Sequence, residues 1–221
     1  TSGTTSVSNG VTISGKTWDN TGTINITGTS GRITLASTST LNNNTGGTIN
    51  YNGTNAFPIT FSGGVDTVNN AGILNVTGGA ATIDTVFNNT GTVNVTTGPL
   101  TINQTGTDTG TYNVPTGQSL TFNSAARSFN AGIAFSGTGS LNFTGSTQTF
   151  NTPMTFTASN PVVTLNGSTL NAPQNLSFTT GWNAQTGTIS GAGVLSTSGT
   201  TSVSNGVTIS GKTWDNTGTI N

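Results

Sequence analysis

The stretch FNNTGTVNVTTGPLTI, residues 87 to 102, decides the fold expected for this chain. Apolar residues alternate with polar ones at Val93-Asn-Val95 and again at Leu100-Thr-Ile102. Alternation with a period of two is typical of strands that turn their apolar side chains to one face. The Asn89-Thr-Gly91 step before the first triplet and the Thr97-Gly98 step between the two triplets favour turns. We therefore expect short strands joined by tight corners.

The same pattern returns roughly every 21 residues along the chain. Phe stands at positions 122, 129 and 135 and again 21 residues later at 143, 150 and 156. Three positions that share one spacing are expected on three faces of one coil. Extension of the first position in both directions predicts a structural ladder of stacked apolar side chains: Ile13, Leu35, Phe61, Ile83, Ile102, Phe122, Phe143, Leu165, Ile189 and Ile209.

These columns predict an all-β fold, a parallel β-helix (β-solenoid) of triangular section, either right- or left-handed. Its coils number about nine in a repeat of 196 residues, which at about 4.8 Å per coil advances the axis by about 43 Å. Asn residues recur after the apolar positions of one column, as at Asn42, Asn69 and Asn88. Stacked Asn side chains are expected to pass amide hydrogen bonds from coil to coil.

A longer repeat encloses the short one. Residues 1 to 25, TSGTTSVSNGVTISGKTWDNTGTIN, recur without a change at 197 to 221. Residues 1–196 are therefore interpreted as one full solenoid repeat, and 197–221 as the start of the next identical repeat in the same rod. We expect the chain to be an internal segment of a tandem array, and its partners to include itself, through lateral or end-to-end association.

Composition argues against catalysis. Thr, Gly, Asn and Ser make up 61% of the residues, charged residues only 4%, and His, Cys and Glu are absent. The usual proton shuttle, thiolate nucleophile and zinc ligands are therefore missing, and we expect no enzyme activity, no cofactor and no metal site. A net charge of −1 offers no basic face for nucleic acid. No apolar run is long enough for a membrane-spanning helix.

Two alternatives rest on acidic and hydroxyl side chains. Asp66 and Asp84 are candidates for a carboxylate pair on adjacent coils, as in polysaccharide-degrading β-helices, whereas Asp19 and Asp108 fall in the Asn corner column. Without supporting His, Glu or Arg, solvated corners are the simpler interpretation. A recurring outward Thr suggests ice binding, but the second Thr file of such proteins is missing: Thr12, Thr34, Thr60, Thr82, Thr101, Thr121, Thr164, Thr188 and Thr208.

Trp182 lies on a long arc between two columns, in the sequence Thr180-Gly181-Trp182-Asn183. An exposed Trp beside Asn183 and Gln185 would form a surface contact with a sugar or with a neighbouring fibre. The alternative is an aromatic side chain packed within a loop.

The motifs WDNTGTINITG (18–28), NNAGILNVTGG (69–79) and FNNTGTVNVTTGPLTI (87–102) resemble the coil repeats of filamentous-haemagglutinin-like giant bacterial adhesins and autotransporter-type β-helical proteins. The resemblance covers essentially the whole chain and is densest from 18 to 122. It implies a secreted, cell-surface fibre without catalysis, used for adhesion, cell–cell association or biofilm formation, with cell-surface glycans or proteins as partners. A glycan-binding segment is the alternative within this class.

Overall fold

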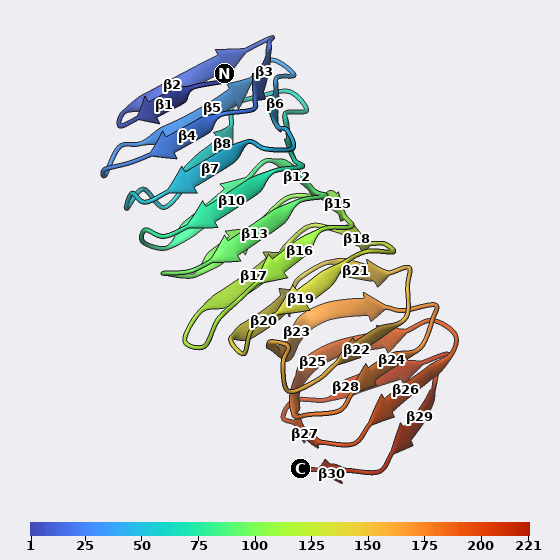
Figure 1. Ribbon diagram of the computed structural model, residues 1–221. Helices are drawn as coiled ribbons and strands as arrows, with labels where there is room; N and C mark the ends of the chain where they lie inside the picture. Colours follow the sequence, from blue (N-terminus) through green and yellow to red (C-terminus); the bar gives the residue numbers. More distant parts are fainter.

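The computed structural model describes residues 1–221 as 30 strands without a helix, wound into a rod of stacked coils (Figure 1). Every pairing between strands is parallel, and successive coils supply the neighbours in each sheet. Thr, Asn, Ser and Gly disfavour helix interiors, and the apolar residues alternate, so the sequence forms strands throughout. The predicted all-β parallel solenoid is confirmed.

Three faces run along the rod, and each is named here by its strands. The first face holds β2 (Gly10–Ser14), β5 (Arg32–Ala36), β8 (Ile59–Phe61), β11 (Ala81–Asp84), β14 (Leu100–Ile102), β17 (Ser119–Asn123), β20 (Ser140–Thr144), β27 (Thr200–Val203) and β30 (Thr219–Ile220). The second face holds β3 (Thr17–Asn20), β6 (Thr40–Asn43), β9 (Thr67–Asn70), β12 (Val86–Asn89), β15 (Gly106–Asp108), β18 (Arg127–Phe129), β21 (Thr147–Phe150) and β28 (Val207–Ser210). Two long strands, β23 (Val162–Asn171) and β25 (Trp182–Ser190), bend across both faces.

The third face completes each coil. It holds β1 (Thr4–Val7), β4 (Thr23–Ile26), β7 (Thr48–Tyr51), β10 (Ile73–Val76), β13 (Thr92–Val95), β16 (Thr111–Asn113), β19 (Ala134–Ser136), β22 (Met154–Phe156), β24 (Leu176–Phe178), β26 (Val194–Thr197) and β29 (Thr213–Asn216). Across the break in pairing between β19 and β22, the rings of Phe135 and Phe156 lie 6.0 Å apart, so the face continues.

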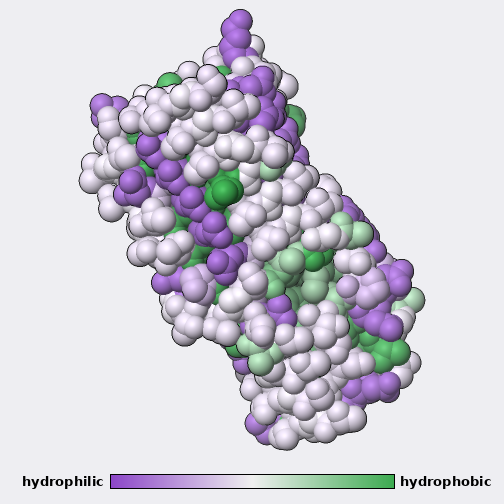
Figure 2. Space-filling view, in the orientation of Figure 1, coloured by the Kyte–Doolittle hydropathy of each residue, from purple (hydrophilic) through white to green (hydrophobic).

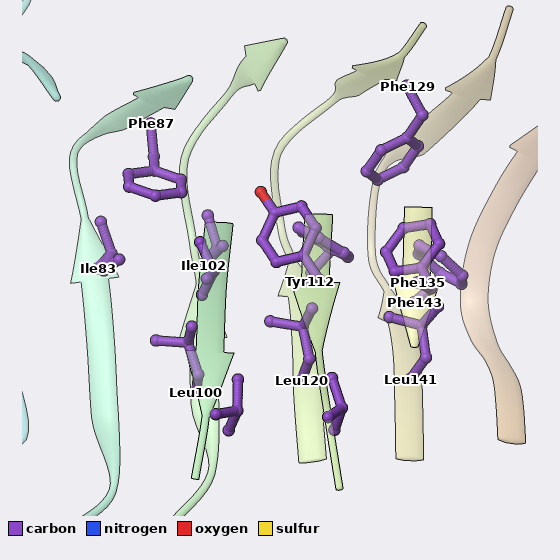
Figure 3. Packing of buried hydrophobic residues seen from close by; sticks show 14 of the residues in the cluster. Ile83, Phe87, Leu100, Ile102, Tyr112, Leu120, Phe129, Phe135, Leu141 and Phe143 are labelled. Carbon is purple, nitrogen blue, oxygen red and sulfur yellow. The ribbon is translucent and has the colours of Figure 1, made fainter. Parts of the chain in front are cut away.

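The core is one continuous column of 40 buried apolar residues along the axis. Figure 3 shows Leu100, Leu120 and Leu141 on successive coils, with Ile102 above Leu100 and Phe143 above Leu141. From Tyr112 to Trp182 half of the buried core residues are aromatic. Like residues stack, as Phe122 does on Phe143 with centroids 5.8 Å apart. Identical side chains in register fill the same space in each coil, which gives a narrow rod its core.

Part of the predicted ladder is wrong. Ile13 aligns with Leu35, and the residues from Ile83 to Leu165 align as expected. Phe61 aligns with Leu35 but is 42% exposed. On the next coil Ile83 aligns with Ile59 and not with Phe61. On the coil after Leu165, the residue aligned with it is Ala184, where Ile189 was predicted. At Phe61 the register between neighbouring coils of the first face shifts by two residues. Beyond Leu165 the cause is different: apolar-Thr-apolar triplets occur on more than one face, so a triplet alone does not identify its face.

Ile189 and Ile209, the last two members of the predicted ladder, lie on the second face beside Leu170. The next coil returns to the position of Leu165 at Ala184, before the chain reaches Ile189. Ile189 therefore falls one face further along.

The long repeat is not a whole number of coils. Strand β1 lies on the third face, whereas β27, which has the same sequence, lies on the first face, paired with β25. The 196-residue repeat thus spans nine coils and one additional face, which agrees with the predicted nine or so. Identical sequences therefore recur one face further around the axis.

Glycine corners are set by close approach between coils. A Cβ atom at Gly72 would lie 2.2 Å from the backbone oxygen of Gly47, and one at Gly91 would lie 2.1 Å from that of Gly72. Neither Gly72, Gly91 nor Gly22 has positive φ. These Gly residues are therefore needed because the preceding coil leaves no room for a side chain, and not for positive φ.

Candidate functional site

Amide ladders are the most regular surface feature. On the third face, Asn50 donates to Asn25, Asn75 to Asn50 and Asn94 to Asn75, with Nδ2–Oδ1 distances of 2.8 to 2.9 Å. Figure 2 shows a line of hydrophilic side chains across this face, over β4, β7, β10 and β13. Each Asn has both a donor and an acceptor, so the ladder can continue over any number of coils.

A second ladder is buried at the corner after the second face. Asn20 donates to Asn43, Asn43 to Asn70 and Asn70 to Asn89 over 2.7 to 2.8 Å, and all four side chains are at most 2% exposed. These residues stand one position after the Asn column predicted from the sequence. That predicted column is hydrogen-bonded too, beginning with Asn42 to Asp19 at 2.8 Å.

The buried ladder ends at an ion pair. Asp108 aligns with Asn89 and is fully buried, and the next coil places Arg127 against it. Arg127 Nε lies 3.0 Å from Asp108 Oδ2 and Nη2 lies 2.7 Å from the same oxygen. The Tyr112 hydroxyl donates to Asp108 Oδ1 at 2.7 Å. Asp108 therefore takes the place of an Asn, as expected, but in the buried ladder one position after the predicted column, where it is a buried structural group.

The electrostatics of this cluster follow from burial. Burial raises the pKa of Asp108, and the Arg127 guanidinium opposes that shift. Burial also raises the pKa of Tyr112 well above its usual value, and the adjacent Asp108 adds to the shift. Arg127 further donates to the backbone oxygens of Gln104 and Phe87. Both Asp108 oxygens are occupied, so the cluster fixes the coils and offers no free acid or base.

The structure gives Asp66 and Asp84 different environments. Asp66 is 2% exposed, and its Oδ1 accepts from the Ser39 amide at 2.6 Å. Asp84 is half-buried, pairs with Thr60 on the neighbouring coil and accepts from Gln104 at 3.2 Å. Asp66 is thus not the solvated corner of the simpler interpretation. Its Oδ2 is buried without a partner beside a cavity of about 180 Å³ lined by Phe61, Val65 and Gln104.

Trp182 is only 2% exposed, so its prediction as a surface contact is wrong. Its ring stacks on Phe178 with centroids 4.6 Å apart, and its Nε1 donates to Thr201 Oγ1 at 2.9 Å. Asn183 and Gln185 are half-buried, and Asn183 donates to Thr164 on the preceding coil. The long arc that suggested protrusion is strand β25, which turns Trp182 inward as its first residue.

The outward Thr residues do not form one continuous file. Thr12, Thr34 and Thr60 align, but on the next coil the residue aligned with Thr60 is Asp84. Thr188 and Thr208 pair with each other on the second face. Asn142 also interrupts the file, between Thr121 and Thr164. The extended Thr surface expected of an ice-binding face is therefore broken.

The most apolar cavity, of about 360 Å³, lies at the end of the rod that carries the C-terminus. Seven of its eight lining residues are hydrophobic, among them Ile209, Trp214 and Ile220. The sequence pattern does not predict this cavity, because the pattern does not say which inward side chains lack a covering coil.

No three acidic side chains gather into a site that could hold a metal ion. No helix that could span a membrane is present. Comparison with protein-family models, with curated proteins and with solved structures finds no match to this chain.

Proposed function

We propose that the chain is a non-catalytic structural segment of an extracellular, cell-surface fibre that mediates adhesion, cell–cell association or biofilm formation. The observation that supports this proposal most is the position of the two copies of the duplicated sequence in the rod. Residues 1–25 and 197–221 form corresponding strands, β1 to β4 and β27 to β30, at opposite ends of one uninterrupted rod. A rod whose sequence restarts without a break in its coils is suited to extension by further repeats.

The surface agrees with a long exposed rod. Its outward positions are mostly Thr, Asn, Ser and Gly, and its inward ion pair is fully satisfied. Uncharged hydroxyl and amide groups provide hydrogen bonding along the fibre without a strong field that would depend on salt. Trp182, the residue that suggested glycan stacking, is buried.

Location and function can be tested in cells that produce the protein. An antibody raised against the folded chain should label intact cells, and deletion of the encoded segment should reduce attachment or clumping. Labelling only after the cells are permeabilised would contradict the proposal.

In purified fibres, electron microscopy should show an axial period of about 45 Å, as nine coils and one face require. Globular beads would contradict a continuous rod.

A further inference from the structure

The cavity of about 180 Å³ lies at the corner between the first and second faces, away from both ends of the rod. The lengths of successive corners explain why it forms. Five residues, 62–66, join β8 to β9, whereas Thr85 alone joins β11 to β12 on the next coil. Gly63 and Gly64 of the wide corner both have positive φ, a conformation that suits Gly. A wide corner stacked on a narrow one leaves a hollow between two coils.

Apolar side chains surround the mouth of this cavity. Phe61 and Val65 line it and are 42% and 71% exposed. Val86, from the start of β12, also lines it and is half-buried. Apolar groups beside an open hollow can hold the hydrocarbon part of a ligand.

A buried carboxylate lies behind this apolar mouth. Asp66 lines the cavity and is 2% exposed, and its Oδ1 accepts from the Ser39 amide at 2.6 Å. Its Oδ2 is the only buried side-chain polar atom among the lining residues that has no hydrogen-bond partner. A buried acceptor without a donor is costly, so this oxygen is suited to accept from a group that enters the cavity.

The charge at this corner is not balanced by the chain itself. The only ion pair is Arg127 with Asp108, and Lys16, in the same corner column as Asp66, is exposed and two coils or about 10 Å away. Asp84 adds a second carboxylate next to Thr85, and it accepts from the side chain of Gln104. The cavity is therefore complementary to a positive charge.

We propose that this cavity binds a primary alkylammonium group, the chemistry of a Lys side chain and of a free aliphatic diamine. The ammonium donates to Asp66 Oδ2, and its hydrocarbon stem lies against Phe61 and Val65. A charged donor on a carboxylate makes a stronger hydrogen bond than a neutral one, and the Phe61 ring adds a favourable contact for a cation.

A metal ion fits the same cavity less well. Calcium takes about six to eight oxygen ligands, whereas this lining offers one carboxylate among apolar side chains, and no three acidic residues gather anywhere in the chain. The Thr85 hydroxyl is already used, because it donates to the Asp66 backbone oxygen at 2.8 Å. An ammonium has three donors and can leave some of them to water.

Amide NMR of the full chain, titrated with n-butylammonium chloride at fixed ionic strength, tests the proposal. The Ser39 amide should shift, because it donates to the carboxylate that binds the probe, and the amides of Thr85 and Gln104 should shift with it. n-Butanol has the same stem without the charge and should bind at least about tenfold more weakly. Equal binding of n-butanol, or no shift at these three amides, would overturn the proposal.

Two variants and a matched control assign the binding to the cavity. Asp66→Asn keeps the shape of the side chain and should weaken n-butylammonium binding by about tenfold or more. Asp84→Asn removes the same charge from outside the lining and should weaken it by less than about threefold. Phe61→Ala changes a half-exposed residue and should weaken it by about threefold, which keeps the test valid if Asp66→Asn does not fold. Wild-type affinity in Phe61→Ala and in a folded Asp66→Asn, or a greater loss in Asp84→Asn, would overturn the proposal.

The two sources of the ammonium group are distinguished by further probes. Tighter binding of Nα-acetyl-lysine amide than of 1,4-diaminobutane would indicate a Lys side chain of a protein partner, and the reverse order would indicate a free diamine. Binding of calcium chloride in preference to every ammonium probe would overturn the proposal in favour of a metal site. The inference goes beyond the proposed function, and its failure would leave the fibre proposal intact, because a continuous rod does not require this ligand.

Discussion

Ile24 and Ile220 occupy the same position of the same 25-residue sequence, yet Ile24 is fully buried while Ile220 is 49% exposed. Ile24 aligns with Ile49 on the next coil, and Ile220 has a neighbour on one side only. Burial in this rod is therefore a property of the stack of coils as much as of the residue.

This pair allows a comparison of one substitution in two settings. Ile24→Ala should lower the free energy of unfolding by about 2 to 5 kcal/mol, because it removes packed methyl groups and leaves a cavity. Ile220→Ala should change it by less than about 1 kcal/mol. Chemical denaturation of both variants checks the difference. Equal losses would mean that the C-terminal coil is covered in solution.

Phe143 and Asn142 are adjacent in the chain but point to opposite sides of β20. Phe143 is fully buried and stacked on Phe122, whereas Asn142 makes one outward hydrogen bond, of 3.3 Å, to Thr121. Phe143→Asp should cost about 4 kcal/mol or more, since it removes a core ring and buries a charge. Asn142→Ser should cost less than about 1 kcal/mol. Similar losses in thermal unfolding would contradict the inward and outward assignment.

The alternation of residues was enough to predict such strands, their parallel stacking and most inward positions. The three faces were harder to assign, because triplets such as Val163-Thr-Leu165 on the first face and Val207-Thr-Ile209 on the second carry no mark of their face. The buried cluster could not be foreseen from Asp108 alone. It depends on Arg127 from the next coil and on Tyr112 from the adjoining face, and only the register between coils brings them together.

Gly72 should be far less replaceable than Gly10. A Cβ at Gly72 would lie 2.2 Å from the Gly47 oxygen, while nothing lies within 4 Å of one at Gly10. Gly72→Ala must therefore separate two coils and should cost about 3 kcal/mol. Gly10→Ala should be nearly neutral. Melting temperatures of the two variants provide the measurement, and a silent Gly72→Ala would show that the corner can open without loss of pairing.

The Arg127–Asp108 pair should be costly to break from one side. Arg127→Met leaves a carboxylate buried without its cation and should cost about 3 to 5 kcal/mol. The exposed Arg32 provides the control, and Arg32→Met should change stability by less than about 0.5 kcal/mol. In the double variant Asp108→Leu/Arg127→Met much of the loss should be recovered, because no buried charge remains. A double variant as unstable as Arg127→Met would assign the loss to packing.

Alkaline pH should destabilise the rod through Tyr112. The pKa of the buried Tyr112 is raised well above its usual value, whereas the unfolded chain ionises near the ordinary pKa of about 10. Below that pH both states are neutral and the stabilisation is complete. Above it the unfolded state loses its proton first, so stability falls by up to about 1.4 kcal/mol per pH unit for this group until the folded-state pKa is reached. Burial also raises the pKa of Tyr51, which adds to the slope.

Denaturation between pH 9 and pH 12 should therefore show a shallower decline in stability for Tyr112→Phe than for wild type. The stability of Tyr112→Phe at neutral pH should be lower, because Asp108 loses a donor. An unchanged slope in Tyr112→Phe, together with a reduced one in Tyr51→Phe, would assign the alkaline sensitivity to Tyr51 instead.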